Sequence, residues 1–197
     1  MKLLQERILQ EGKVISDNIL KVDSFLNHQI DPALMDELGK EIANRFRAIQ
    51  PTKVLTLESS GIAVALMAGL HLKIPVLFAK KKKPSTMKED SYSAHVHSFT
   101  KNITTDVIVS AKYLAPEDRI LIVDDFLANG DAATALADIV HQSKATLLGV
   151  SVAIEKGFQP GRKLLEGKNI LVDSLVSIES LVGGKITFTC YKNNSHR

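Results

Sequence analysis

Short runs of branched aliphatic residues recur along the chain and are separated by polar segments or by apolar residues at helical spacing. Unbroken apolar runs of this length are typical of strands buried on both faces, as in a parallel sheet. The pattern predicts strands over Lys53–Leu57, Val76–Ala79, Asp106–Ala111, Ile120–Val123, Leu147–Ile154 and Ile170–Val176, and an edge strand over Ile186–Cys190.

Apolar residues at intervals of three and four predict the helices between these strands. Residues 3–18 are expected to form one amphipathic helix. A second begins at Asp31-Pro32, because aspartate is a favoured N-cap and proline a favoured first helical residue, and it ends before Pro51. Ile62–Leu72 forms a third. The alternation predicts an α/β fold, a mostly parallel sheet with helices on both faces.

Composition narrows the class of protein. The 197 residues are 45% hydrophobic, which suits a single domain over residues 1–197. A formal charge of +3 is too small to indicate a nucleic-acid partner. The single cysteine, Cys190, excludes an internal disulfide and favours a reducing, cytoplasmic location. The charged N-terminus does not resemble a signal peptide, and no apolar run reaches membrane-spanning length.

The stretch from Ile120 to Thr134, ILIVDDFLANGDAAT, carries the clearest candidate chemistry. Two adjacent acids follow the predicted strand, and a turn of small residues then leads into an alanine-rich helix. Ligands of parallel sheets bind beyond the carboxyl ends of the strands, where loop amides and a helix N-terminus can hold a phosphate. Capping of the helix is the alternative role for the acids, but two in tandem before such a turn favour a ribose-phosphate site. The residues concerned are Asp124, Asp125, Ala128, Asn129, Gly130, Asp131 and Ala132.

These residues resemble the signature of the type I phosphoribosyltransferases, in particular their purine branch. That signature is a hydrophobic strand, two acids, and a loop that holds the 5-phosphate of phosphoribosyl pyrophosphate (PRPP). The resemblance implies that Asp124 and Asp125 are the catalytic pair, which binds the ribose hydroxyls, and that residues 128–132 bind the phosphate. The chain departs from the family at Asn129, where Thr or Ser is usual, and at Asp131, whose carboxylate would lie beside a phosphate.

A second strand-to-helix junction carries Glu58, Ser59 and Ser60, followed by Gly61. Free backbone donors at the start of a helix suit an anion, although serine is also a common helix cap. The resemblance implies that these three residues hold the pyrophosphate of PRPP.

The lysine run Lys80–Lys83 opens a long polar stretch with little hydrophobic periodicity, which is typical of a lid. The alternatives are a solvated charge run and a nucleic-acid patch, but the run lacks the neighbouring aromatic residues on which bases stack. The resemblance implies a loop that closes over PRPP, with Lys81 as a contact to the substrate.

Lys156 follows another predicted strand, and Phe126 and Phe158 are candidate aromatic faces for a flat base. The resemblance implies a purine acceptor, with Leu20, Asn27 and Lys156 lining its pocket. Without that resemblance, Asn27 would be interpreted as a turn residue before the second helix.

The expected base is xanthine, ahead of hypoxanthine, guanine and adenine. Related enzymes for hypoxanthine and guanine carry a carboxylate where this chain has Ala128, which instead resembles the adenine type. Xanthine readily loses a proton near neutral pH, so a cation such as Lys156 suits it.

The resemblance also implies xanthosine 5'-monophosphate as the product, a role in purine salvage, Mg²⁺ carried with PRPP, and a homodimer. A small hood is expected from residues 1–50 and a later segment. Three alternatives stay open: an adenine-type enzyme, a PRPP-sensing regulator with an added helix-turn-helix, and a nucleic-acid module using Lys80–Lys83. The sequence offers no dedicated metal site, since its histidines lack ligand spacing; the histidines weighed are His71, His95, His97 and His141.

Overall fold

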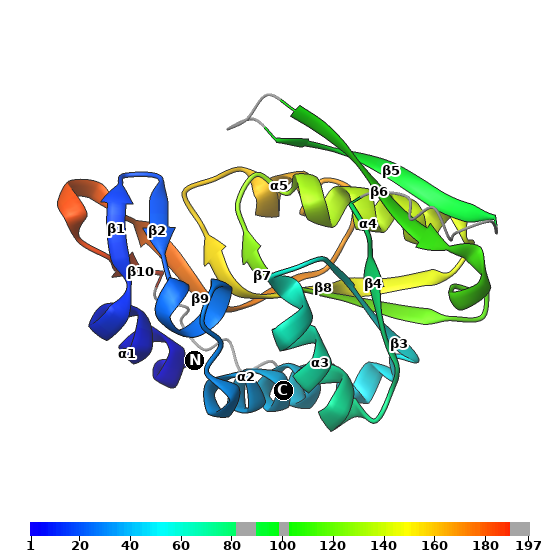
Figure 1. Ribbon diagram of the computed structural model, residues 1–197, viewed down its shortest axis with the longest axis horizontal. Helices are drawn as coiled ribbons and strands as arrows, with labels where there is room; N and C mark the ends of the chain where they lie inside the picture. The colour runs from blue at the N-terminus through cyan, green and yellow to red at the C-terminus, as the bar shows by residue number, and fades with distance from the viewer. Residues whose placement is uncertain (82–89, 99–102, 190–197) are drawn as a thin grey trace.

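A computed structural model describes residues 1–81, 90–98 and 103–189 (Figure 1). A six-stranded sheet in the order β10-β9-β8-β7-β3-β4 lies at its centre. Strand β10 pairs antiparallel with β9, and the other neighbours pair in parallel, so the predicted fold class is confirmed. The strands are β3 (Lys53–Leu57), β4 (Val76–Ala79), β7 (Arg119–Leu127), β8 (Thr146–Lys156), β9 (Val172–Ser180) and β10 (Thr187–Phe188).

Helices cover both faces of this sheet, with α2 (Pro32–Phe46) and α3 (Gly61–Leu72) on one side and α4 (Asp131–Gln142) and α5 (Gly161–Glu166) on the other (Figure 1). Side chains of β7 alternate between the two layers. Leu121 and Val123 pack with α2 and α3, whereas Ile120 and Ile122 pack with α4. Both faces of the strand are therefore buried, which explains its unbroken apolar sequence.

The predicted single helix over residues 3–18 is wrong. Helix α1 (Lys2–Glu11) ends before Gly12, whose backbone is extended, and a hairpin of β1 (Lys13–Ser16) and β2 (Ile19–Lys21) follows. The β-branched pair Val14-Ile15 favours a strand. A Cβ at Gly12 would lie only 2.4 Å from the carbonyl oxygen of Ile8, so glycine is needed where the chain leaves the helix.

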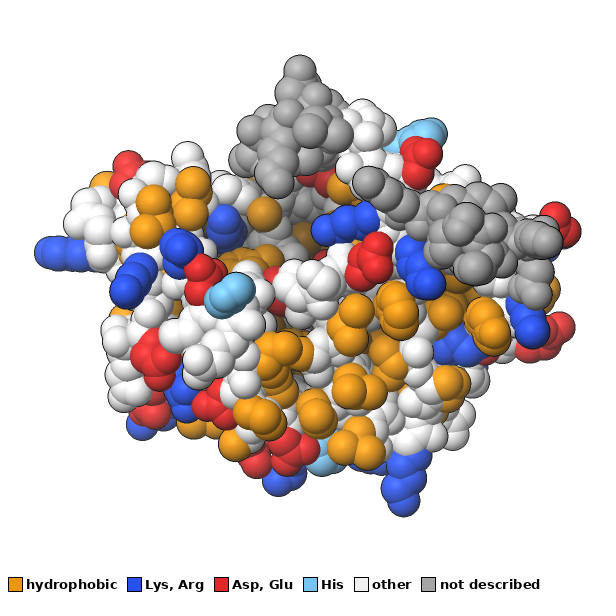
Figure 2. Space-filling view, viewed as in Figure 1, with side chains coloured by type: hydrophobic (Ala, Val, Ile, Leu, Met, Phe, Trp, Pro, Cys, Tyr) orange, Lys and Arg blue, Asp and Glu red, His pale blue; other side chains and the backbone are white. Residues whose placement is uncertain are grey.

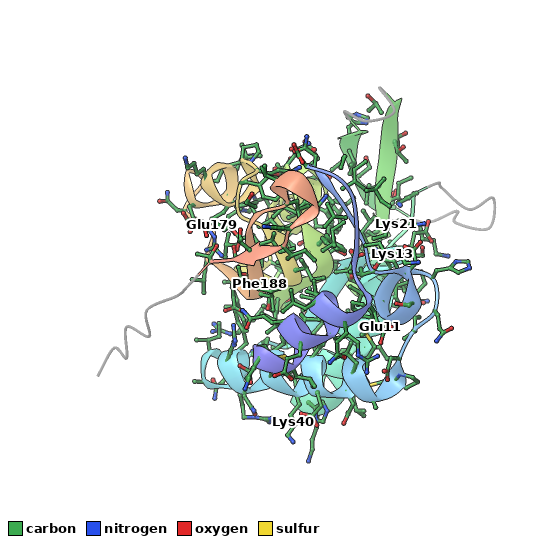
Figure 3. The ribbon with its side chains drawn as sticks, turned by 90° about the vertical axis from the view of Figure 1, so that its left-hand side faces the viewer. Glu11, Lys13, Lys21, Lys40, Glu179 and Phe188 are labelled. Carbon is green, nitrogen blue, oxygen red and sulfur yellow. The ribbon has the colours of Figure 1, made fainter. Side chains whose placement is uncertain are left out.

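This N-terminal segment lies at the β10 end of the molecule. Strand β1 contacts the short helix η4 (Val182–Gly184), and Figure 3 shows Lys13 and Lys21 on the hairpin and Phe188 on the C-terminal strand. Between the hairpin and α2 runs a short π-helix, η1 (Asp23–Asn27). A hairpin thus separates the two helices of residues 1–50, so these residues do not form a helix-turn-helix.

A second hairpin, of β5 (Ser91–Ser98) and β6 (Ile103–Ser110), occupies part of the stretch expected to be a structureless lid, so that expectation is wrong over residues 91–98. The strand was missed because its apolar residues are few and alternate with serine and histidine. Tyr92, Ala94 and Val96 pack beside the α4 layer. Lys82, Lys83 and Cys190 lie outside the described residues.

Two short helices complete the described chain, η2 (Arg47–Ile49) and η3 (Ala111–Tyr113). In the described residues, no helix is both long enough and apolar enough to span a membrane.

Candidate active site

The two adjacent acids lie inside β7, near its carboxyl end, rather than after it. Strand β7 runs between β3 and β8, so the acids occupy the middle of the edge where parallel strands end. Asp124 and Asp125 are each only 7% exposed. The backbone amide of Asp125 donates to Oδ1 of Asp124 at 2.9 Å.

Burial, reinforced by the neighbouring Asp125, raises the pKa of Asp124 well above its usual range, and the positive charge of Lys81 partly opposes this. The carboxyl group is closely packed. A Cβ on Gly61 would lie 2.3 Å from its Oδ1 and 2.4 Å from Oγ1 of Thr56. A ligand that donates hydrogen bonds, as sugar hydroxyls do, would offset the cost of burying this acid.

The small-residue turn leads directly into α4. Gly130 has φ 90° and caps the helix, and the amide of Thr134 donates to its carbonyl at 2.9 Å. A left-handed φ favours glycine. The first amides of α4 lack partners within the helix and point toward the turn, as in anion sites at helix N-termini. Asp131 is the first residue of α4, where the helix dipole stabilises a carboxylate without any ligand.

The second junction lies beside the acids. The backbone amide of Lys81 donates to Glu58 Oε1 at 2.6 Å, and the amide of Glu58 donates to the carbonyl of Ala79 at 3.1 Å. The peptide bond between Glu58 and Ser59 is cis. The fold therefore brings Lys81 and Glu58 into contact, and the charge of Lys81 acts on Asp124.

A cavity of about 500 Å³ extends from Asp124 along the small-residue turn at residues 128–132, the predicted phosphate turn, to Lys156. Its predicted members are Asp124, residues 128–132, Phe126 and Lys156. Sequence reasoning missed several others that come from the two hairpins and from the loop after β8. These are Ser16, Asn18, Ile19, Val96 and Gln159.

Lys156 holds the far end of this cavity. Its Nζ donates to the carbonyl of Asn18 at 2.8 Å and lies 5.7 Å from the centroid of the Phe126 ring. Burial lowers the pKa of Lys156. The ammonium group retains donor capacity beside an aromatic face, an arrangement that suits a flat, electron-rich or anionic ring.

The structure does not bring Leu20, Asn27 or Phe158 to this cavity. Leu20 is 7% exposed and packs in the core, while its neighbour Ile19 lines the cavity because successive strand residues point in opposite directions. Asn27 is exposed at the end of η1, and Phe158 is 37% exposed. The proposed contacts of Leu20 and Asn27 with a base stay predictions.

Known proteins resemble this chain along nearly its whole length. A xanthine phosphoribosyltransferase of Moorella thermoacetica is 59% identical over 188 residues, which are 95% of this chain and 96% of that protein. One from Bacillus cytotoxicus is 53% identical, with 95% of each chain covered. One from Acinetobacter baylyi is 52% identical, with coverage of 95% and 98%. No family model matches.

Solved structures of adenine phosphoribosyltransferases share the fold. The enzyme of Rhodothermus marinus superposes with a TM-score of 0.73 at 22% identity, over 90% of this chain and 99% of that one. The Trypanosoma brucei enzyme, in complex with AMP, pyrophosphate and ribose-5-phosphate, gives 0.73 at 16% identity, over 88% and 79%. At these identities the likeness establishes a type I phosphoribosyltransferase fold, not the base.

Proposed function

Because this chain belongs to the xanthine phosphoribosyltransferase family, we propose that it transfers the phosphoribosyl group of PRPP to xanthine. The products are xanthosine 5'-monophosphate and pyrophosphate, and the reaction serves purine salvage. Besides family membership, one observation carries this proposal. A single cavity joins the buried acid Asp124, a phosphate-type turn at residues 128–132, and a half-buried lysine against an aromatic ring.

The two ends of the cavity, at Asp124 and at Lys156, have different proposed roles in this transfer. As pyrophosphate leaves, the C1 carbon of the ribose gains oxocarbenium character, so the enzyme must hold the sugar, stabilise the leaving charge and exclude water. Asp124 and Asp125 accept hydrogen bonds from the ribose hydroxyls, and the turn amides hold the 5-phosphate. Glu58, Ser59, Ser60 and Lys81 lie where the pyrophosphate would leave. Lys156 holds the base.

Mg²⁺ is proposed to enter with PRPP. The ion prefers oxygen ligands and keeps several waters, so the acidic pair is a suitable partner for its hydration shell. Within the described ranges, no three His, Cys, Asp or Glu side chains converge as a metal site. Phosphate oxygens of the substrate would therefore supply the inner ligands, and Mg²⁺ would neutralise the leaving pyrophosphate.

The proposal is tested by pyrophosphate release from PRPP with Mg²⁺ and each purine base in turn. Xanthine should support turnover at a far lower concentration than hypoxanthine, guanine or adenine. Preference for adenine would replace the proposal by the adenine-type alternative. PRPP binding without turnover on any base would favour the alternative of a PRPP-sensing regulator.

Neutralising Lys81 should lower turnover more than stability. The variant Lys81→Gln removes a charge that acts on Asp124, yet the side chain is exposed. We expect a clear fall in kcat and an unchanged melting temperature. The control is Lys40→Gln, an exposed lysine of α2 far from the cavity (Figure 3). A variant that lost thermal stability but kept full activity would contradict this role for Lys81.

The N-terminal hairpin is proposed to be the hood, because Ser16, Asn18 and Ile19 reach the cavity from it. It would cover the base and exclude water during transfer.

A cytoplasmic location is also proposed and is supported by the single cysteine of the chain.

A homodimer is proposed on the basis of an apolar surface over α3 and β4, where Figure 2 shows orange side chains gathered. Leu66 and Leu70 of α3 are 53% and 62% exposed, and Phe78 of the edge strand β4 is 40% exposed. Contiguous apolar surface of this kind marks protein interfaces. Leu70→Asp should therefore give monomers in sedimentation velocity. The control Leu9→Asp, on exposed helix α1, should leave dimers; monomeric parent protein would contradict the proposal.

A further inference from the structure

A buried ion pair between Glu155 and Arg162 adjoins Lys156, the proposed base-binding lysine. Glu155 precedes Lys156 on β8 and is 2% exposed. The Arg162 guanidinium of α5 makes a bidentate contact with this carboxylate: Nε donates to Oε1 at 2.7 Å and Nη2 donates to Oε2 at 2.6 Å. Ser174 Oγ of β9 donates to Oε2 at 2.7 Å, and Arg162 Nη1 donates to the carbonyl of Val172 at 2.9 Å. This two-point geometry fixes direction as well as distance.

The other side of the pair adjoins the phosphate turn. The amide of Gly161, next to Arg162, donates to the carbonyl of Ala128 at 3.0 Å. A Cβ on Gly161 would lie 2.4 Å from that carbonyl oxygen and 3.0 Å from the amide nitrogen of Gly130. Helix α5 is thus packed directly on the turn, so the turn, which β7 and α4 flank, sets where Arg162 lies.

Backbone hydrogen bonds hold the start of the loop between Lys156 and α5. The amide of Gly157 donates to the carbonyl of Ile178, and that of Gln159 to the carbonyl of Lys156, each at 2.8 Å. The pair of Glu155 and Arg162 adds a side-chain connection from the end of β8 to α5. An apolar pair of similar volume often stabilises a fold as well as a buried ion pair does, so stability alone does not explain this pair.

We propose that Glu155 and Arg162 are positioning residues: their two-point ion pair fixes the Lys156 ammonium relative to the phosphate turn and so sets the distance from the base to the ribose carbon. The inference rests on the proposed function. Sub-ångström placement matters in a transfer that depends on positioning, and an error of about 1 Å can cost about 100-fold in rate.

The test compares steady-state kinetics of Arg162→Lys and Glu155→Gln with the parent. Both variants keep hydrogen-bonding groups but lose the two-point ionic geometry. We expect kcat/KM for xanthine to fall by about 10- to 100-fold, with a raised KM for xanthine. Calorimetric affinity for PRPP should change much less, because β7 and α4 hold the phosphate turn independently. Kinetic constants equal to those of the parent, in either folded variant, would overturn the proposal.

A comparable ion pair at the amino ends of β3 and β7 separates positioning from stability. Lys53 and Asp118 lie 2.6 Å apart with side chains 17% and 14% exposed, compared with 26% and 3% for Arg162 and Glu155. Asp118→Asn should lower the melting temperature and leave the KM for xanthine unchanged. An equal rise in KM in this control would show that the effect is general loss of stability and would overturn the proposal.

A milder variant covers the case in which the pair cannot be broken without unfolding. Ser174→Ala removes one hydrogen bond to Glu155 and should raise the KM for xanthine severalfold; parental kinetics in this variant would overturn the proposal. A parent without turnover on xanthine would instead refute the proposed function, so the two failures are distinguishable.

Discussion

The double variant Asp124→Asn with Asp125→Asn should lose at least about 100-fold in kcat/KM for PRPP while remaining folded. Both acids lie near the carboxyl end of β7, and Asp124 lines the cavity beside the turn of residues 128–132, where the sugar would be held. Asparagine can still accept the hydrogen bond that Asp125 N donates to residue 124, but it has no charge for an oxocarbenium ion or for hydrated Mg²⁺. Calorimetry with PRPP and Mg²⁺ should show weakened binding.

The double variant should lose activity, but replacing Asp124 alone should raise the stability of the fold. Because burial raises the pKa of Asp124 in the folded chain, its protonated form favours folding at low pH, and that contribution is lost as the pH rises through the raised pKa. Above the ordinary pKa range of an aspartate, Asp124→Asn should therefore unfold at a higher temperature than the parent, and its advantage should grow as the pH rises from that range through the raised pKa of Asp124. Asp138→Asn, an exposed change on α4, is the control. In the double variant, undiminished PRPP affinity would refute the assignment of Asp124 and Asp125 to the ribose hydroxyls.

The second large effect is expected at Lys156. Lys156→Ala should lower kcat/KM for xanthine by about 100-fold or more, because a polar pocket loses affinity steeply when one partner is left unpaired. The ammonium group lies 5.7 Å from the Phe126 ring centroid, and burial lowers its pKa, so its charge is poorly screened by water. Turnover on adenine, which we expect to be low, should change much less, since adenine carries no 2-oxo group and no readily lost proton.

Lys163→Ala provides the matched control, since Lys163 is an exposed lysine of neighbouring α5. It should leave the preference for xanthine unaltered. A Lys156→Ala variant as active on xanthine as the parent, or a parent that uses xanthine and adenine equally well, would remove Lys156 from the base site.

The central sheet and the phosphate turn could be predicted from the sequence because their signals are local. The run Ile120–Val123 is apolar on both faces, and the acids and small residues follow it directly. Likewise, Asp31 marks the start of α2 by accepting hydrogen bonds from the amides of Ala33 and Leu34. Such signals lie within one turn of helix or a few residues of strand, so no distant contact is needed to interpret them.

Other features depend on residues far apart in the chain. The partner of Lys156 Nζ is the carbonyl of Asn18, 138 residues away, and any residue can present a carbonyl, so no sequence pattern predicts it. Similarly, helical spacing near the N-terminus obscured the hairpin that places Ile19 in the cavity and Leu20 in the core. The sequence by itself determined the fold class and the small-residue turn that follows β7. Only tertiary packing decided which side chains meet around Lys156, because that end of the cavity forms where distant segments come together.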